Sequence, residues 1–87
     1  MLFIRPSGFD KSFRKLPKKI REKAIERLGV SEIDQFDPLL NNHKLRHEYA
    51  EYRSINIAGD HRIVYRMIDA GTCFLMAIGD HDSLFGL

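Results

Sequence analysis

The chain has 87 residues, of which 44% are hydrophobic and 30% are charged. A chain of this length builds one small core, and this composition is typical of a folded globular protein rather than a disordered one. We therefore expect a single domain over residues 1–87. No apolar run reaches the roughly 18 to 20 residues that a membrane-spanning helix needs, so no membrane partner is expected. Cys73 is the only cysteine, which excludes an internal disulfide and a cysteine-rich zinc site and favours a cytoplasmic location.

Charge is distributed unevenly along the chain. Residues 1–30 carry nine Lys/Arg and three Asp/Glu, a net charge of +6, whereas residues 31–87 carry five Lys/Arg and nine Asp/Glu, a net charge of −4. A dense basic cluster can follow the phosphates of a polyanion. It can equally be the solvated face of a helix with Lys–Glu pairs, such as Glu22 with Lys18, Lys19 and Lys23 nearby. Charge alone leaves both interpretations open.

The first half of the chain predicts a short strand followed by two helical segments. Leu2 to Ile4 is apolar, and Pro6 ends it. Apolar residues then recur at helical spacing. They are Phe9, Phe13 and Leu16, followed beyond Pro17 by Ile20, Ala24, Ile25 and Leu28. Since proline is favoured in the first turn of a helix, Pro17 either separates two helices of a hairpin or kinks one helix. The end of the second segment stays open because Gly29 weakens it.

The second half of the chain changes to the period of two that is typical of strands. Residues 52–57 and 61–68 alternate, and residues 72–78 are nearly all apolar, so we expect the last strand to be central and covered on both faces. Short turns at 58–60 and 69–71 join these segments into an antiparallel meander. Helices followed by strands predict an α+β fold, with the helical layer on one face of a twisted sheet.

Four histidines, His43, His47, His61 and His81, lie near predicted turns and strand ends, where functional side chains are often placed. If the turn at 69–71 joins two antiparallel strands, Arg62 at the start of one lies beside the end of the other, close to His81. One site containing Arg62 and His81 is the functional hypothesis, and ordinary polar surface at a sheet edge is the alternative. Nothing in the histidine spacing fixes a set of metal ligands, so no metal site is predicted.

Four motifs between Leu39 and Phe85 resemble the RelE/ParE superfamily of bacterial toxins, and more closely its YafQ-like branch. They are His43-Lys44-Leu45, Tyr52-Arg53-Ser54, Asp60-His61-Arg62-Ile63-Val64-Tyr65 and Ile78-Gly79-Asp80-His81-Asp82-Ser83-Leu84-Phe85. The N-terminal strand and the basic helices also fit, so the resemblance covers essentially the whole chain. It implies an α+β fold in which two N-terminal helices pack on a curved antiparallel sheet of about four strands. It also implies that the protein is the toxin of a type II toxin–antitoxin system. Such a toxin inhibits translation by cleaving mRNA, usually on the ribosome, without a metal or other cofactor.

The same resemblance implies a set of site residues. His43, Asp60 and His81 match site residues of YafQ-like toxins, and Arg62 matches a catalytic arginine of RelE. Phe85 matches an aromatic residue that shapes the site or stacks on a base. We expect His81 to be the general acid or base, with His43 or Asp60 as its complement. Arg62 would stabilise the charge of the phosphorane.

Four positions depart from the YafQ pattern. Asn56 replaces a histidine, His61 a tryptophan, Ala77 an arginine and Asp80 the usual threonine. Asp80 places an additional anion beside His81, where it should repel a phosphate or favour the protonated imidazole. His61 and Asp80 are therefore auxiliary candidates, and His61 either substitutes for a missing partner or only caps a turn.

The resemblance also implies partners for the basic helices. Five basic residues would contact ribosomal RNA without reading its sequence: Lys11, Arg14, Lys15, Lys18 and Lys19. The expected partners are mRNA, the ribosome and a small, acidic, partly disordered antitoxin. Three alternatives stay open: a ParE-type poison of DNA gyrase, a non-catalytic homologue that acts through antitoxin binding or operon regulation, and a stand-alone RNA-binding module. The set of His43, Asp60 and His81 argues against the gyrase poison, whereas Asp80 and Ala77 favour the non-catalytic homologue.

Overall fold

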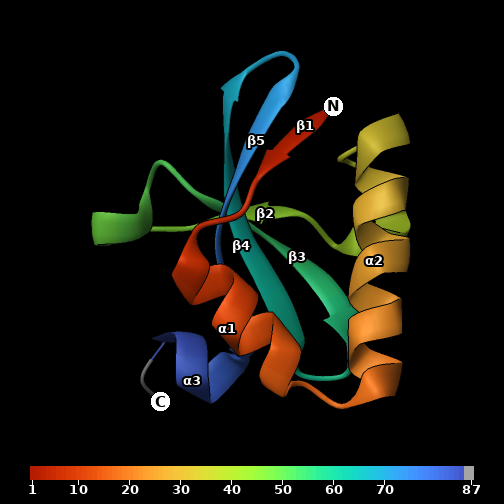
Figure 1. Cartoon of the computed structure of the whole chain (residues 1–87). Coiled ribbons are helices and arrows are strands. Elements are labelled where there is room, and N and C mark those ends of the chain that lie inside the picture. Colours follow the sequence, from red (N-terminus) through yellow and green to blue (C-terminus); the bar gives the residue numbers. More distant parts are fainter. Residues whose placement is uncertain (86–87) are drawn as a thin grey trace.

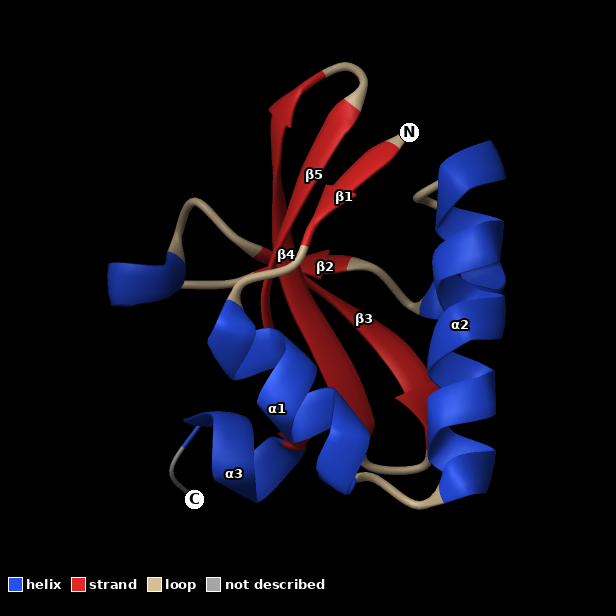
Figure 2. Ribbon diagram, in the orientation of Figure 1, coloured by secondary structure: helices blue, strands red, loops and turns tan. Residues whose placement is uncertain are grey.

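The computed structural model describes residues 1–85, in which two long helices pack on one face of a five-stranded sheet (Figures 1 and 2). In chain order the elements are β1 (Leu2–Ile4), α1 (Ser7–Lys15), α2 (Lys18–Ile33), the 3₁₀ helix η1 (Pro38–Leu40), β2 (His43–Lys44), the 3₁₀ helix η2 (His47–Tyr49), β3 (Arg53–Ala58), β4 (His61–Asp69), β5 (Thr72–Asp80) and α3 (His81–Phe85). No helix among residues 1–85 is long and apolar enough to span a membrane. The predicted α+β class is confirmed.

The strand order across the sheet is β1-β5-β4-β3-β2. The predicted meander of β3, β4 and β5 is confirmed, because each pairs antiparallel with the next. The sheet has five strands rather than about four, since the two-residue β2 adds to the edge of β3. It is also mixed, because β1 pairs in parallel with β5, with Leu2 opposite Thr72. The intervening chain supplies the long crossover that a parallel pair requires.

Two separate helices build the helical layer. Leu16 and Pro17 are both extended, with ψ of 150° and 148°, so the chain turns between α1 and α2 instead of kinking within one helix. Phe9 of α1 and Ala24 of α2 are 3% and 0% exposed. Ile25, which the helical spacing placed in the same stripe, is 63% exposed, because neighbours on a helix point about 100° apart.

One face of the sheet completes the core. Its buried side chains come from β3, β4 and β5, and they are Ile55, Ile57, Ile63, Tyr65, Cys73, Leu75 and Ile78. Burial raises the pKa of the Cys73 thiol to about 11, so it stays protonated at neutral pH and packs as a small apolar group. The apolar side chains of β5 are all at least half-buried, as expected of an inner strand.

A bulge in β5 determines which of its apolar side chains face the core. Val64 lies opposite Ala77, whereas the next residue, Tyr65, lies opposite Leu75. The extra residue, Met76, lets Leu75 and Ile78 both face the core although they are three residues apart. Beyond the bulge the strand leads into α3, which carries two of the predicted site residues.

Candidate active site

An open pocket of about 300 Å³ lies on the sheet face opposite the two long helices. Ser54 and Arg62 line it, and they alternate along their strands with the core residues Ile55 and Ile63, which places the pocket on the other face. The complete lining consists of His43, Leu45, Ser54, Arg62, His81 and Phe85. Four of the five predicted catalytic residues therefore lie around one pocket.

Strand pairing brings these residues together from distant parts of the chain. His43 lies opposite Ser54 in the β2–β3 pair. Arg62 lies opposite Gly79 in the β4–β5 pair, two residues before His81. The proximity of Arg62 and His81 that the turn at 69–71 predicted is confirmed, since both line the pocket.

His43 is an exposed residue whose imidazole lies against the backbone of Asn41, two residues earlier. Its Nδ1 atom lies 3.1 Å from the carbonyl oxygen of Asn41. Because a carbonyl oxygen can only accept, Nδ1 is the protonated nitrogen of the neutral ring. Nε2 therefore carries the lone pair, and in this tautomer it is the atom able to accept a proton.

Arg62 is held by the turn that precedes it. Its Nη1 atom donates to the carbonyl oxygens of Gly59 and His61 at 2.8 and 3.1 Å. Gly59 has a φ of +52°, which allows this tight turn. Within residues 1–85, Nε and Nη2 of Arg62 make no hydrogen bond, so one edge of the guanidinium can still bind two phosphate oxygens.

α3 positions the other two predicted residues. The His81 backbone N–H donates to the carbonyl oxygen of Asp60 at 3.1 Å. The rings of His81 and Phe85, four residues apart on this helix, have centroids 4.9 Å apart and are tilted by 56°. Both side chains therefore face the same pocket from one turn of helix.

Asp80 stands at the N-terminus of α3 and acts as its cap. Its Oδ1 accepts the backbone N–H of Ser83 at 2.7 Å. This hydrogen bond holds the pKa of the Asp80 carboxyl below its ordinary value, with a smaller contribution from His61. The carboxylate that the sequence placed beside His81 is thus engaged by the helix backbone.

Asp60 and His61 lie outside the pocket lining. Asp60 is exposed in the turn between β3 and β4, and its main-chain oxygen, rather than its carboxylate, contacts α3. His61 is half-buried and lies opposite Asp80 across the β4–β5 pair. Neither side chain therefore lines the pocket with His43, Arg62 and His81, although the backbone of both residues adjoins α3 or its preceding strand.

The predicted basic residues all lie exposed on α1 and α2. They are Lys11, Arg14, Lys15, Lys18 and Lys19. The side-chain ion pairs among residues 1–85 are Arg5–Asp10 at 4.0 Å and Lys23–Glu26 at 3.4 Å, so none of the five is paired with an acid. Within the described part of the chain, Glu22 forms no ion pair with Lys18, Lys19 or Lys23, and Lys23 pairs with Glu26 instead.

Ser54 is a pocket residue that sequence reasoning missed. Its side chain is 0% exposed, and its hydroxyl has no hydrogen-bond partner among residues 1–85. A buried polar group without a partner costs about 1 to 3 kcal/mol, and this hydroxyl borders the pocket without being exposed to it. The sequence pattern did not single out Ser54, because the same strand also holds the polar residues Arg53 and Asn56.

The chemistry of the pocket comes from two imidazoles and one guanidinium. Within residues 1–85, no cluster of three or more His, Cys, Asp or Glu side chains is placed to hold a metal ion. Imidazoles exchange protons near neutral pH, and guanidinium groups bind phosphate. The pocket is thus equipped for acid–base chemistry at a phosphodiester.

Neither a protein-family model nor a curated protein sequence matches the chain. Solved structures do. A YoeB/ParE toxin from Agrobacterium tumefaciens is 20% identical and has a TM-score of 0.80, over 93% of this chain and 99% of the toxin. YafQ from E. coli is 17% identical with a TM-score of 0.72, over 97% of both chains. A chain of the RelB–RelE antitoxin–toxin complex from Methanococcus jannaschii is 18% identical with a TM-score of 0.73, over 99% of this chain and 96% of that chain. The protein therefore has the fold of the RelE/ParE toxins, as the sequence motifs predicted.

Proposed function

We propose that this protein is the toxin of a type II toxin–antitoxin pair, a metal-independent endoribonuclease that cleaves mRNA on the ribosome and so inhibits translation. The observation that carries the proposal is the pocket of about 300 Å³ in which His43, Arg62, His81 and Phe85 meet. The shared fold supports it, because the solved structures of this fold include YafQ and RelE toxins.

The proposed reaction uses the RNA 2′-hydroxyl as its nucleophile. Nε2 of His43 takes the hydroxyl proton while the oxygen attacks the adjacent phosphorus. His81 gives a proton to the 5′-oxygen as its bond to phosphorus breaks. The products are a 2′,3′-cyclic phosphate and a 5′-hydroxyl end. His43 is assigned the role of base because its Nδ1 is committed to the Asn41 carbonyl, and because Asp60 lies outside the pocket.

The remaining pocket residues bind rather than transfer protons. The free edge of Arg62 donates two hydrogen bonds to the phosphate oxygens, which gain charge in the phosphorane. The ring of Phe85 offers a surface on which a base can stack.

Replacing His81 or His43 by alanine tests this mechanism. Each change should slow ribosome-dependent mRNA cleavage by about 10²- to 10⁴-fold, the usual contribution of a general acid or base. The measurement is the cleavage rate of mRNA on programmed ribosomes, with the cleaved ends identified as cyclic phosphate. His47→Asn is the matched control, because His47 is exposed outside the pocket and its φ of +57° suits asparagine. Unchanged cleavage rates in both alanine variants would contradict the proposed mechanism.

The proposed regulator is an antitoxin that binds the toxin and blocks its pocket. Complexes named RelB–RelE and DinJ–YafQ share this fold, which supports a protein partner here. Toxicity on expression with intact mRNA would favour the gyrase poison instead. Antitoxin binding with neither toxicity nor cleavage would favour the non-catalytic homologue.

A further inference from the structure

Asn42, the residue before His43, is fixed by hydrogen bonds to three other segments of the chain. Its Nδ2 atom donates to the Tyr65 hydroxyl at 2.5 Å and to the Gln35 carbonyl oxygen at 2.8 Å. Its Oδ1 atom accepts from Nε of Arg53 at 2.6 Å. The Tyr65 hydroxyl in turn donates to Oε1 of Gln35 at 2.8 Å. We call these four residues, Gln35, Asn42, Arg53 and Tyr65, the Asn42 network.

The chemistry of the Asn42 network permits one arrangement of the amide. Arginine only donates, so the amide oxygen must face Arg53 and the NH₂ group must face Tyr65 and Gln35. Tyr65 is 3% exposed, and burial raises the pKa of its phenol, which therefore keeps the proton that it donates to Gln35. Water cannot easily replace partners at such a buried hydroxyl.

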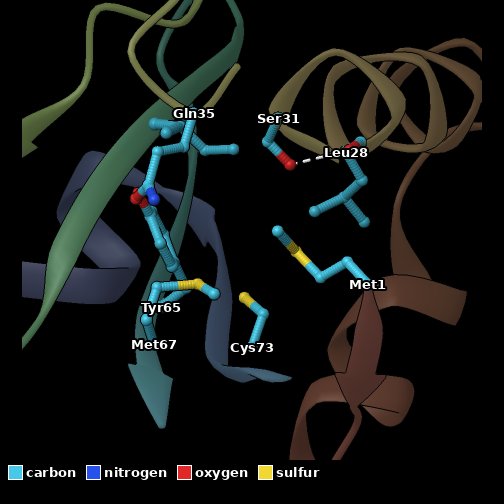
Figure 3. A pocket seen from close by; sticks show the side chains of 8 residues that line it. Met1, Leu28, Ser31, Gln35, Tyr65, Met67 and Cys73 are labelled. Carbon is cyan, nitrogen blue, oxygen red and sulfur yellow. Dashed lines mark hydrogen bonds between the residues drawn. The ribbon is translucent and has the colours of Figure 1, made fainter. Parts of the chain in front are cut away.

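The Asn42 network lies on the core side of the sheet. Tyr65 belongs to the hydrophobic core, and Figure 3 shows its ring on β4 beside Met67, directed toward Gln35. Arg53 lies opposite Tyr65 in the β3–β4 pair. Because successive residues of an extended chain point to opposite faces, fixing Asn42 on the core side directs His43 to the pocket side, where it lies opposite Ser54.

The chain that leads to Asn42 is held as well. Leu40 is 0% exposed, and Asp37 caps η1 by accepting the Leu39 N–H at 2.9 Å. Asn41 adopts a left-handed conformation with a φ of +45°, and its carbonyl oxygen is the one that faces Nδ1 of His43. The same anchored segment thus sets both the place of His43 and its tautomer.

We infer that Asn42 is a positioning residue for His43, and that the Asn42 network holds Nε2 of His43 in the pocket as a proton acceptor. The inference rests on the proposed function for its catalytic consequence, but the geometry can be tested without activity. Its structural claim is that the buried phenol of Tyr65, with the half-buried amide of Asn42 and guanidinium of Arg53, fixes an imidazole on the other face of the sheet.

Two variants test the inference. Asn42→Ala removes the centre of the network, and Tyr65→Phe removes only the hydroxyl while leaving the ring in the core. In the wild-type protein, long-range ¹H–¹⁵N NMR of the imidazole should show His43 with its proton on Nδ1. In both variants we expect a mixture of tautomers and a single-turnover cleavage rate about 10- to 100-fold lower, with KM changed less than about twofold. Tyr52→Phe is the control, because Tyr52 belongs neither to the Asn42 network nor to the pocket lining.

The results separate this inference from the proposed function. If wild-type His43 carries its proton on Nε2, or if both variants keep the wild-type tautomer and rate, the inference is overturned, even when His43→Ala abolishes cleavage. If the wild-type protein cleaves no RNA, the proposed function fails, and the tautomers still decide the positioning. If Asn42→Ala does not fold, Tyr65→Phe, which keeps the ring in the core, decides the comparison.

Discussion

At the level of single residues, Asp80 both caps α3 and places a negative charge beside His81, and the sequence pointed only to the charge. It replaces the threonine of the YafQ pattern, and its carboxylate accepts the Ser83 N–H at 2.7 Å. Threonine side chains also cap helix N-termini, so aspartate keeps a capping side chain at this position. Aspartate also adds a negative charge at the N-terminus of α3, where the helix dipole stabilises anions.

Asp80→Ala should therefore lower the melting temperature, and Asp80→Thr should lower it less because threonine restores a cap. The effect depends on pH. The folded-state pKa of Asp80 is depressed below the ordinary 3.8, so its stabilisation is complete above pH 3.8 and is lost as the pH falls through the folded value. Thermal unfolding at neutral pH and in acid measures the difference in melting temperature between each variant and the wild type. A difference between wild type and Asp80→Ala that grows in acid would contradict the cap.

At the level of elements, η1 joins the helical layer to the strand that carries His43. Leu40 is 0% exposed and packs in the core, whereas its neighbour Leu39 is 51% exposed. Nη1 of Arg27 on α2 donates to the Leu39 carbonyl at 3.1 Å, which ties the segment to the helix. A short segment is thus anchored by one buried side chain and by its backbone.

Leu40→Ala should reduce the free energy of unfolding by about 2 to 5 kcal/mol, because it removes buried methyl groups and leaves a cavity. Leu39→Ala is the matched control, with the same chemical change one residue away and an expected effect within about 0.5 kcal/mol, as is usual at the surface. Urea denaturation measures both. Equal reductions in the two variants would show that η1 is not anchored through Leu40.

At the level of the whole molecule, positive charge gathers on the two N-terminal helices. Lys11, Arg14 and Lys15 are exposed without acidic partners in residues 1–85, whereas Arg5 and Lys23 form ion pairs. Unpaired basic side chains remain available to replace the counterions of RNA phosphates.

Changing Lys11, Arg14 and Lys15 to glutamine should weaken RNA binding. It should also reduce the slope of log affinity against log salt by about one for each RNA phosphate that the variant no longer neutralises. Fluorescence anisotropy with a labelled ribosomal RNA fragment over a range of salt measures both. The control changes Arg5 and Lys23 to glutamine. If the slope falls equally per charge in both variants, net charge alone accounts for binding and the helices form no local RNA-binding surface.

The sequence predicted the elements well because their signals are local. Period-two alternation gave β3 and β4, helical spacing gave α1 and α2, and proline marked the boundary between the helices. The spacing was wrong for Ile25, and the order of the strands in the sheet could not be read locally. The parallel pairing of β1 with β5 depends on residues at the two ends of the chain.

The sequence by itself determined the α+β class and, through its motifs, four of the residues that line the pocket. Only the tertiary structure decided that Asp60 and His61 lie outside it, that Asp80 caps a helix, and that Ser54 lies in its floor. The reason is physical. A strand pattern states which residues share a face, but the strand register and the β5 bulge set which residues meet across strands. The site of this protein is built from such cross-strand neighbours.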